Sequence, residues 1–270
     1  MPSPEESSAM TAPKQSNDSS LSVIVITKNE ADDLPDCLSS VAWANEIVVV
    51  DSGSTDQTIA IARAHTESVF EQAWLGFGPQ KNLALDHATC QWVLSIDADE
   101  RITKALAEEI RSILCNTEHD AFTIPFRSTF LGQPIRFGDW RRDRKLRLFR
   151  RSAGRFKNVP VHEQIIVQGT IGTLQNHIEH HSYRDRSEID EKTDRYASLG
   201  AEEAHANGRS THRLEAINRC ILAFVRTYII RFGFLDGRTG FQLAKMIAKG
   251  TYLRYRRLAD LNRASSERSS

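Results

Sequence analysis

The sequence predicts an α/β fold: a mostly parallel sheet flanked by helices, with a helical extension at its C-terminal end. In the first 115 residues, short runs rich in Val and Ile alternate with segments of helical periodicity, and short turns separate them. Such alternation is typical of βαβ units, whose strands are parallel. The regularity stops near residue 120, and residues 185–258 have the pattern of helices.

The first half of the chain contains the elements of this sheet in order. LSVIVIT, at residues 21–27, is an apolar, β-branched run typical of a buried parallel strand. Pro79 is suited to the start of a helix, Thr103 to a helix cap, and Ser54 or Thr55 to the cap of the helix ending near His65. Further strands are expected at 46–51, 68–71 and 91–96, and helices at 32–41, 55–65, 79–87 and 103–114.

The second half of the chain is less regular. A Gly-rich segment at 233–240 divides its helices. Residues 1–20 and 261–270 are expected to be disordered tails, and the first of them lacks the basic start and apolar core of a signal peptide. Strand-like pieces lie at 121–127, 145–150 and 164–167.

The composition excludes several classes of protein. Hydrophobic residues make up 40% and charged residues 26%, a globular balance that a wholly disordered, collagen-like or disulfide-framework chain does not have. The four cysteines lack metal-ligand spacing and predict reduced thiols in a cytosolic protein. The most apolar stretch, 221–235, is interrupted by Arg226 and Arg231, so no membrane-spanning helix is predicted.

The net charge of zero conceals opposed blocks. The whole chain has 35 basic and 35 acidic residues. Residues 136–157 contain ten basic and two acidic side chains, and residues 209–268 contain thirteen and four. The remainder of the chain is therefore acidic, and this asymmetry indicates separate surfaces for separate partners.

Three predicted strands end in polar residues. These are TKNE at 27–30, DSGS at 51–54 and DAD at 97–99. Open parallel sheets bind ligands beyond the carboxyl ends of their strands, and carboxylates suit a hard cation such as Mg²⁺ or Mn²⁺. The arrangement predicts a site for a metal-bound nucleotide diphosphate.

Each of these motifs also has a structural interpretation. Asp99 and Glu100 are acids of the kind that favour the first turn of a helix. Asp51 could belong to an ordinary turn between strand and helix, and Asn29 and Glu30 could be helix-entry residues. The joint arrangement at three strand ends favours the functional interpretation.

Longer motifs resemble a known family. SVIVITKNE, EIVVVDSGSTDQT and GFGPQKNLALDHATCQWVLSIDADE resemble the family 2 glycosyltransferases of GT-A fold. KLRLFRRSAGRF, VHEQI, HHSYRD and RTYIIRFGFLDGRTGFQLA resemble their lipopolysaccharide-core β-glucosyltransferases of the KdtX/WaaE type. The resemblance implies a catalytic domain at 21–184, with a nucleotide-sugar half at 21–125 and an acceptor half at 126–184. A helical region at 185–260 would follow.

The resemblance also implies a UDP-sugar donor, a divalent metal and inversion at the anomeric carbon. Asp97 would contact the ribose and the metal, and Asp99 would bind the metal. The expected nucleotide-sugar contacts are Thr27, Asn29, Glu30, Asp51 and Lys81.

Inverting transfer requires a base that removes the proton of the acceptor hydroxyl. Glu163 is the candidate, with Asp139 and Asp143 as rivals. His162 is a candidate metal ligand. The adjacent pair at 180–181 is interpreted as structural, with His181 a weak acceptor-site candidate, because neighbouring residues of a strand point to opposite faces.

The basic blocks suggest two further partners. Trp140, Arg141, Arg142 and Arg147 are candidate contacts for a charged, lipid-linked oligosaccharide, since guanidinium groups suit carboxylates and phosphates. The alternative is a solvated surface. The basic amphipathic helices at 209–257 predict peripheral contact with an anionic membrane. Their alternative is packing on the catalytic domain or on a second subunit.

The expected activity is transfer of a hexose, with glucose favoured, to a heptose of the lipopolysaccharide inner core at the cytoplasmic face of the inner membrane. A polyprenyl-linked glycan or a protein is the alternative acceptor. The alternative of another class is a non-catalytic module that binds anionic lipid or nucleic acid. On the leading hypothesis the partners include no nucleic acid, and a homo-oligomer is allowed.

Overall fold

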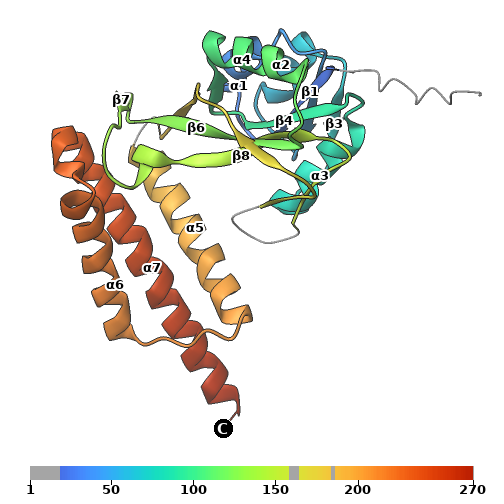
Figure 1. The fold of residues 1–270 in the computed structure, drawn as a ribbon. Coiled ribbons are helices and arrows are strands. Elements are labelled where there is room, and N and C mark those ends of the chain that lie inside the picture. Colours follow the sequence, from blue (N-terminus) through green and yellow to red (C-terminus); the bar gives the residue numbers. More distant parts are fainter. Residues whose placement is uncertain (1–18, 158–163, 184–185, 270) are drawn as a thin grey trace, which may run out of the picture.

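The computed structural model describes residues 19–157, 164–183 and 186–269. A large twisted sheet forms the centre, helices cover it, and three long helices project from one end (Figure 1). The predicted fold class, an α/β sheet flanked by helices with a C-terminal helical extension, is confirmed.

Four parallel strands form the first half of the sheet. They are β1 (Leu21–Thr27), β2 (Glu46–Asp51), β3 (Val69–Glu71) and β4 (Trp92–Asp97), arranged in the order β3-β2-β1-β4. Each lies within one residue of its predicted bounds. Consecutive β1 side chains point to opposite faces, and Val23 and Ile24 are both buried, so the sheet is covered on both sides.

Four helices provide that cover. They are α1 (Leu34–Ser40), α2 (Thr58–His65), α3 (Phe77–His87) and α4 (Lys104–Leu114). Helices α1, α2 and α4 pack on the face that contains Val23, and α3 packs on the face that contains Ile24. Figure 1 shows α1, α2 and α4 above the sheet and α3 below it.

The predicted helix starts are partly corrected. Thr103 caps α4 as expected, because its hydroxyl oxygen accepts the backbone N–H of Leu106. Helix α2 begins only at Thr58, beyond the predicted cap, because the Ser54 hydroxyl is bonded to Asp51 instead. Helix α3 begins two residues before Pro79, which lies in its first turn.

The second half of the sheet is mixed rather than parallel. It contains β8 (Arg144–Arg150), β6 (Ala121–Phe130), β12 (Ile178–Ser182) and β5 (Glu100–Ile102), which follow β4 in that order. Strand β8 is antiparallel to β4 and β6, whereas β12 is parallel to β6 and antiparallel to β5. The smaller elements are β7 (Gln133–Pro134), β9 (Gly154–Phe156), β10 (Ile165–Val167), β11 (Ile171–Thr173) and the 3-10 turn η1 (Asp139–Arg142).

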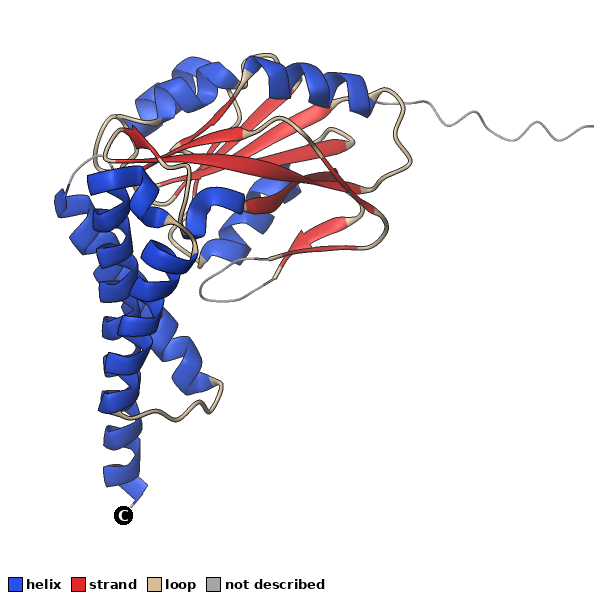
Figure 2. Cartoon of the chain, turned by 60° about the vertical axis from the view of Figure 1, so that its left-hand side comes forward, coloured by secondary structure: helices blue, strands red, loops and turns tan. Residues whose placement is uncertain are grey.

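The helical extension projects from the sheet as a bundle (Figure 2). It consists of α5 (Arg186–Ala206), α6 (Arg213–Val225), the π-helical turn η2 (Arg226–Ile230), the 3-10 turn η3 (Gly233–Asp236) and α7 (Gly237–Ser269). Helix α7 packs against both α5 and α6. The predicted Gly-rich break is present, and a Cβ atom on Gly240 would lie 1.9 Å from the carbonyl oxygen of Gly233.

The prediction of a disordered tail at 261–270 is corrected for residues 261–269, because α7 continues through Ser269. Leu258 is buried and Leu261 packs beside it, against Ala201 and Ala204 of α5. This contact with α5 explains why the helix extends beyond residue 260. Within the described residues, no helix is both long and apolar enough to cross a membrane.

Candidate active site

The polar ends of β1, β2 and β4 lie side by side at one edge of the sheet. Thr27 pairs with Asp51 in the β1–β2 register, and Ile26 pairs with Asp97 in the β1–β4 register. The predicted meeting of these strand ends is therefore confirmed.

Asp51 organises the turn that follows β2. Its Oδ1 accepts the backbone N–H groups of Gly53 and Ser54 at 2.9 and 2.8 Å. Its Oδ2 accepts the hydroxyls of Thr27 at 3.0 Å and Ser54 at 2.5 Å. A carboxylate has about four acceptor positions, so these bonds leave little capacity for a nucleotide. The observed role of Asp51 is structural, and its nucleotide contact stays a prediction.

Asn29 and Glu30 connect the end of β1 to the same turn. Asn29 has a φ of 55°, in the left-handed region that Asn tolerates, and its Oδ1 accepts the Thr55 N–H at 2.8 Å. Glu30 donates its backbone N–H to the Thr58 hydroxyl at 2.8 Å. These bonds fix the shape of the rim on which a nucleoside contact is predicted.

Asp97 sits between two buried cations. Lys81 of α3 donates to its Oδ1 at 2.8 Å, and Arg147 of β8 donates to its Oδ2 at 2.7 Å. Burial alone would raise the pKa of the Asp97 carboxyl, but Arg147 and Lys81 outweigh burial and hold it well below its usual value. Asp97 is therefore ionised, and Lys81 points at this carboxylate rather than into open solvent.

Glu100 is fully buried behind Asp97. Its Oε1 accepts from Arg147 at 2.5 Å, and its Oε2 accepts the backbone N–H of Asp97 at 3.0 Å. Burial raises the pKa of Glu100 to about 7, although Arg147 opposes that shift. Arg147 thus joins two carboxylates, and Glu100 fixes the backbone that precedes Asp99.

Asp99 forms a pair with His180 of β12. Asp99 Oδ2 and His180 Nε2 are 3.3 Å apart, and each side chain is 22% exposed. Burial alone would raise the pKa of Asp99, but the hydrogen bond and charge of His180 lower it. Burial alone would lower the pKa of His180, but Asp99 raises it.

Asp99, Glu100 and His180 form a candidate metal cluster. Each offers one ligand atom, and these atoms all lie within 4.8 Å of one another. Asp99 and His180 retain some exposure, whereas Glu100 is occupied by Arg147. The two partly exposed groups are therefore the better ligand candidates.

The interpretation of the pair at 180–181 as structural stays a prediction, but the structure makes His180 a candidate ligand as well. Strand alternation separates the two side chains, as expected, but it directs His180 toward the carboxylates and leaves His181 exposed. His180 lies opposite Glu100 in the β5–β12 register, and the N–H of His181 donates to the Asp99 carbonyl at 2.9 Å. The alternation argument excludes a shared ion for both histidines, but it leaves one of them available.

The candidate base and the candidate histidine ligand could not be placed in this site. Glu163 and His162 fall outside the described residues. The rival Asp139 forms ion pairs with Arg226 and Arg231 at 2.7 and 2.8 Å.

The predicted acceptor contacts separate into different places. The prediction that Arg147 contacts the acceptor is corrected, because Arg147 is 5% exposed and paired with Asp97 and Glu100 inside the site. Trp140 is half-buried and stacks on Tyr183 with ring centroids 6.3 Å apart. Arg141 is exposed, with its guanidinium over the Phe137 ring. The side chain of Arg142 lies outside the described part.

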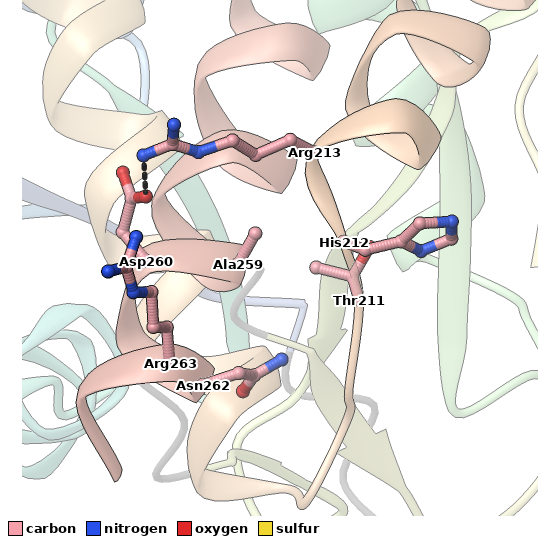
Figure 3. A pocket seen from close by; sticks show the side chains of 7 residues that line it. All are labelled: Thr211, His212, Arg213, Ala259, Asp260, Asn262 and Arg263. Atoms are coloured by element: carbon pink, nitrogen blue, oxygen red, sulfur yellow. Dashed lines mark hydrogen bonds and ion pairs between the residues drawn. The ribbon is translucent and has the colours of Figure 1, made fainter. Parts of the chain in front are cut away.

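A shallow pocket of about 380 Å³ lies far from this site, between the start of α6 and the end of α7 (Figure 3). An ion pair between Arg213 and Asp260, at 3.0 Å, forms one side of it. The pocket contains neither the strand ends nor the metal cluster, so we assign the chemistry to the sheet edge. Its lining residues are Thr211, His212, Arg213, Ala259, Asp260, Asn262 and Arg263.

Comparison with known proteins gives a consistent family. The family model for glycosyl transferase family 2 matches residues 22–175. The lipopolysaccharide core biosynthesis glycosyltransferase LpsC of Rhizobium meliloti (strain 1021) is 30% identical over 250 residues, which cover 87% of this chain and 93% of that protein. The chain therefore belongs to glycosyltransferase family 2, and it is an enzyme. The alternative of a non-catalytic module is set aside.

Solved structures also align with this chain, at low sequence identity. S. aureus TarS 1–349 in complex with UDP-GlcNAc aligns with a TM-score of 0.47 and 16% identity, over 91% of this chain and 92% of that one. Glucosyl-3-phosphoglycerate synthase from Mycobacterium tuberculosis, in complex with Mn²⁺ and UDP-glucose, aligns with a TM-score of 0.35 and 22% identity. That alignment covers 40% of this chain and 44% of the synthase.

Proposed function

We propose that the enzyme transfers a hexose, with glucose favoured, from a UDP-sugar to a heptose of the lipopolysaccharide inner core, with inversion at the anomeric carbon. The observation that carries the proposal is the Asp99–His180 pair at the sheet edge where β1, β2 and β4 end. Family membership supports sugar transfer, and similarity to a protein named for lipopolysaccharide core biosynthesis supports this acceptor.

The side chains present fit a divalent cation, Mg²⁺ or Mn²⁺. Asp99 supplies a carboxylate, and His180 supplies an imidazole nitrogen close to it. Glu100 and Asp97 would support the site from behind through Arg147. When bound, the ion would stabilise the negative charge that develops on the leaving diphosphate.

Two lysines are placed to assist the same charge. The charge of Lys145 helps to lower the pKa of His180, and the charge of Lys192 helps to lower the pKa of Asp99, so both charges act on the cluster. Lys145 lies at the start of β8 and is partly exposed. Cations fixed near a developing phosphate charge lower the barrier because they need no reorganisation during the reaction.

The transfer itself is one displacement. The acceptor hydroxyl oxygen forms a bond to the anomeric carbon while the bond from that carbon to the diphosphate oxygen breaks, and UDP leaves from the opposite face. The hydroxyl proton passes to a carboxylate base, for which we propose Glu163.

The acceptor would bring charge and a lipid anchor. Exposed cations of the 136–157 block, such as Arg141, are the expected contacts for its carboxylates and phosphates. The anchor would place the enzyme at the cytoplasmic face of the inner membrane, with the basic helical region toward the lipid.

A donor screen tests the activity. The purified chain is incubated with UDP-glucose, UDP-galactose or UDP-N-acetylglucosamine, with Mn²⁺ or Mg²⁺, and UDP release is measured. We expect one UDP-hexose to be preferred, a heptose-terminated inner-core acceptor to increase its turnover, and a chelator to abolish it.

Two results would contradict parts of the proposal. If no donor is consumed with either metal, the donor class is wrong. If a polyprenyl-linked glycan or a protein accepts the sugar while the heptose acceptor does not, only the acceptor is wrong.

A further inference from the structure

Helix α6 exposes a row of large apolar side chains along its length. We call this row, formed by Leu214, Ile217, Ile221, Leu222 and Val225, the outer apolar face. These side chains are between 37% and 67% exposed. At about 100° per residue they occupy one stripe of the helix, and Ile229 and Ile230 of η2 extend the exposed apolar surface beyond it.

The opposite face of α6 contains small residues. Ala216 and Ala223 are buried, as is Thr227 in the following turn, and α6 packs against α7. Helices of water-exposed domains normally bury their large apolar residues. Ala216, Ala223 and the ring of Phe224, which packs on Phe241 of α7, face the neighbouring helix. The aliphatic residues of the outer apolar face point outward, as they do in helices that contact lipid.

Cationic side chains border the outer apolar face. By helical geometry, Arg219 and Arg226 project on one side of the stripe and Arg213 on the other. Glu215 is the one acidic residue in this helix, and it pairs with Arg219 at 3.1 Å. The other two arginines also have acidic partners, since Arg213 pairs with Asp260 and Arg226 with Asp139. The excess positive charge belongs to the helical region as a whole, because residues 209–268 contain thirteen basic and four acidic side chains. Two copies meeting through this region would bring like charges together, whereas an anionic lipid surface complements them.

We propose that α6 lies in the plane of an anionic bilayer surface, with the outer apolar face inserted roughly 5–10 Å among the lipids and the arginines at the phosphates. This inference deepens the proposed function by assigning the membrane contact to one helix face. It rests on that function only for the lipid anchor of the acceptor.

Polar contacts tie the end of α6 to the segment before β8. Asp139 pairs with Arg226 and Arg231, and the Gly138 N–H donates to the Arg231 carbonyl at 2.9 Å. The Asp236 carboxylate accepts the N–H of Phe137 at 2.9 Å. Figure 1 shows the junction between α6 and α7 beside β7.

The same segment leads to the catalytic cluster. Trp140 stacks on Tyr183, which directly follows β12, the strand that carries His180. Insertion of α6 into the bilayer surface would therefore fix the distance between the sheet edge and the lipid. The enzyme would meet an acceptor whose sugar extends from that surface.

Vesicle co-sedimentation tests the inference without any sugar substrate. Wild-type protein is mixed with vesicles of phosphatidylcholine alone, or with added phosphatidylglycerol. We expect binding to the anionic vesicles that weakens as salt increases. We expect Ile221→Asp with Leu222→Asp to lower the partition coefficient at least about tenfold, because two inserted apolar side chains become charged.

The matched control is Ile171→Asp. Ile171 is 51% exposed, close to the 55% of Ile221, but it lies on β11 of the catalytic domain. This variant should bind anionic vesicles like the wild type. Circular dichroism and UDP-sugar hydrolysis should be unchanged in all variants, which excludes misfolding as the cause of lost binding.

Two outcomes would overturn the inference. One is vesicle binding by the double variant that equals the wild type. The other is a wild-type dimer in analytical ultracentrifugation that the double variant dissociates, with no vesicle binding by either protein. That result would assign the outer apolar face to a second copy of the chain.

An activity comparison separates this inference from the proposed function. The double variant should transfer sugar normally to a delipidated, water-soluble acceptor and at least about tenfold more slowly to the same acceptor in anionic vesicles. If neither protein transfers sugar to either acceptor, the proposed function fails while the vesicle result still stands.

Discussion

The two halves of the sheet contribute to the site in different ways. In the parallel half, Asp51 and Asn29 bind groups within their own two loops, and these bonds shape the rim. In the mixed half, His180 and Arg147 reach the carboxylates from strands that lie much later in the chain. The first half forms a framework around the site, and the second completes its ionic cluster.

A residue that stands out in a sequence motif is therefore not always the one whose side chain is available to a ligand. Asp51 is prominent in the sequence but is saturated by hydrogen bonds in its turn. His180 begins the HHSYRD motif, whose two adjacent histidines predict no shared ion, yet it lies 3.3 Å from Asp99. Substitutions in the two halves should therefore have different consequences for stability and for turnover.

The largest expected effect on stability follows Arg147→Met. The substitution keeps an extended side chain but leaves the buried carboxylate of Glu100 without its cation. Breaking a buried ion pair in this way costs about 3–5 kcal/mol. Urea denaturation measures the loss in the free energy of unfolding.

Arg155→Met is the matched control. Arg155 pairs with Asp86 at the surface, where both side chains are more than half exposed. We expect a change of at most about 1 kcal/mol. Equal losses for the two variants would show that the buried cluster is no more important to stability than a surface pair.

The largest expected effect on turnover follows Asp99→Ala. Asp99 is partly exposed and is proposed to hold the metal, so UDP release should fall about 10²–10³-fold while stability changes little. Steady-state kinetics measures the first quantity and thermal unfolding the second. Asp86→Ala provides the surface control, and turnover that is unchanged in Asp99→Ala would refute the assigned role.

Asp51→Ala should have a smaller effect, and it should lower stability rather than turnover. It removes the acceptor of two backbone N–H groups and two hydroxyls, and we expect a loss of about 1–3 kcal/mol in unfolding free energy. Asp51→Asn retains one acceptor oxygen and should lose less. A large increase in donor KM in Asp51→Asn at unchanged stability would instead indicate a direct nucleotide contact.

The parallel half was predictable because its signals are local. A buried strand such as LSVIVIT appears as a continuous apolar run, and Thr103 caps its helix through a residue three positions later. The meeting of Asp51 and Asp97 at one edge follows from parallel topology alone. These features require no knowledge of distant contacts.

The mixed half was not predictable in the same way. Whether Arg147 faces an acceptor or Glu100 depends on how β8 pairs with β4 and β6, and the sequence contains no local signal of that pairing. The choice between His180 and His181 depends on the register of β12 beside β5. The extra helical turns at 261–269 depend on packing of Leu258 against α5.

Direct measurement of Mn²⁺ binding tests the central claim, that Asp99 and His180 form the metal site. Calorimetric titration in the presence of UDP should detect a single Mn²⁺ site in the wild type. Its affinity should fall at least about tenfold in both Asp99→Ala and His180→Ala, and remain unchanged in His181→Ala, because a lost ligand weakens the site more than a lost neighbour does. Wild-type Mn²⁺ affinity in both Asp99→Ala and His180→Ala would contradict the account.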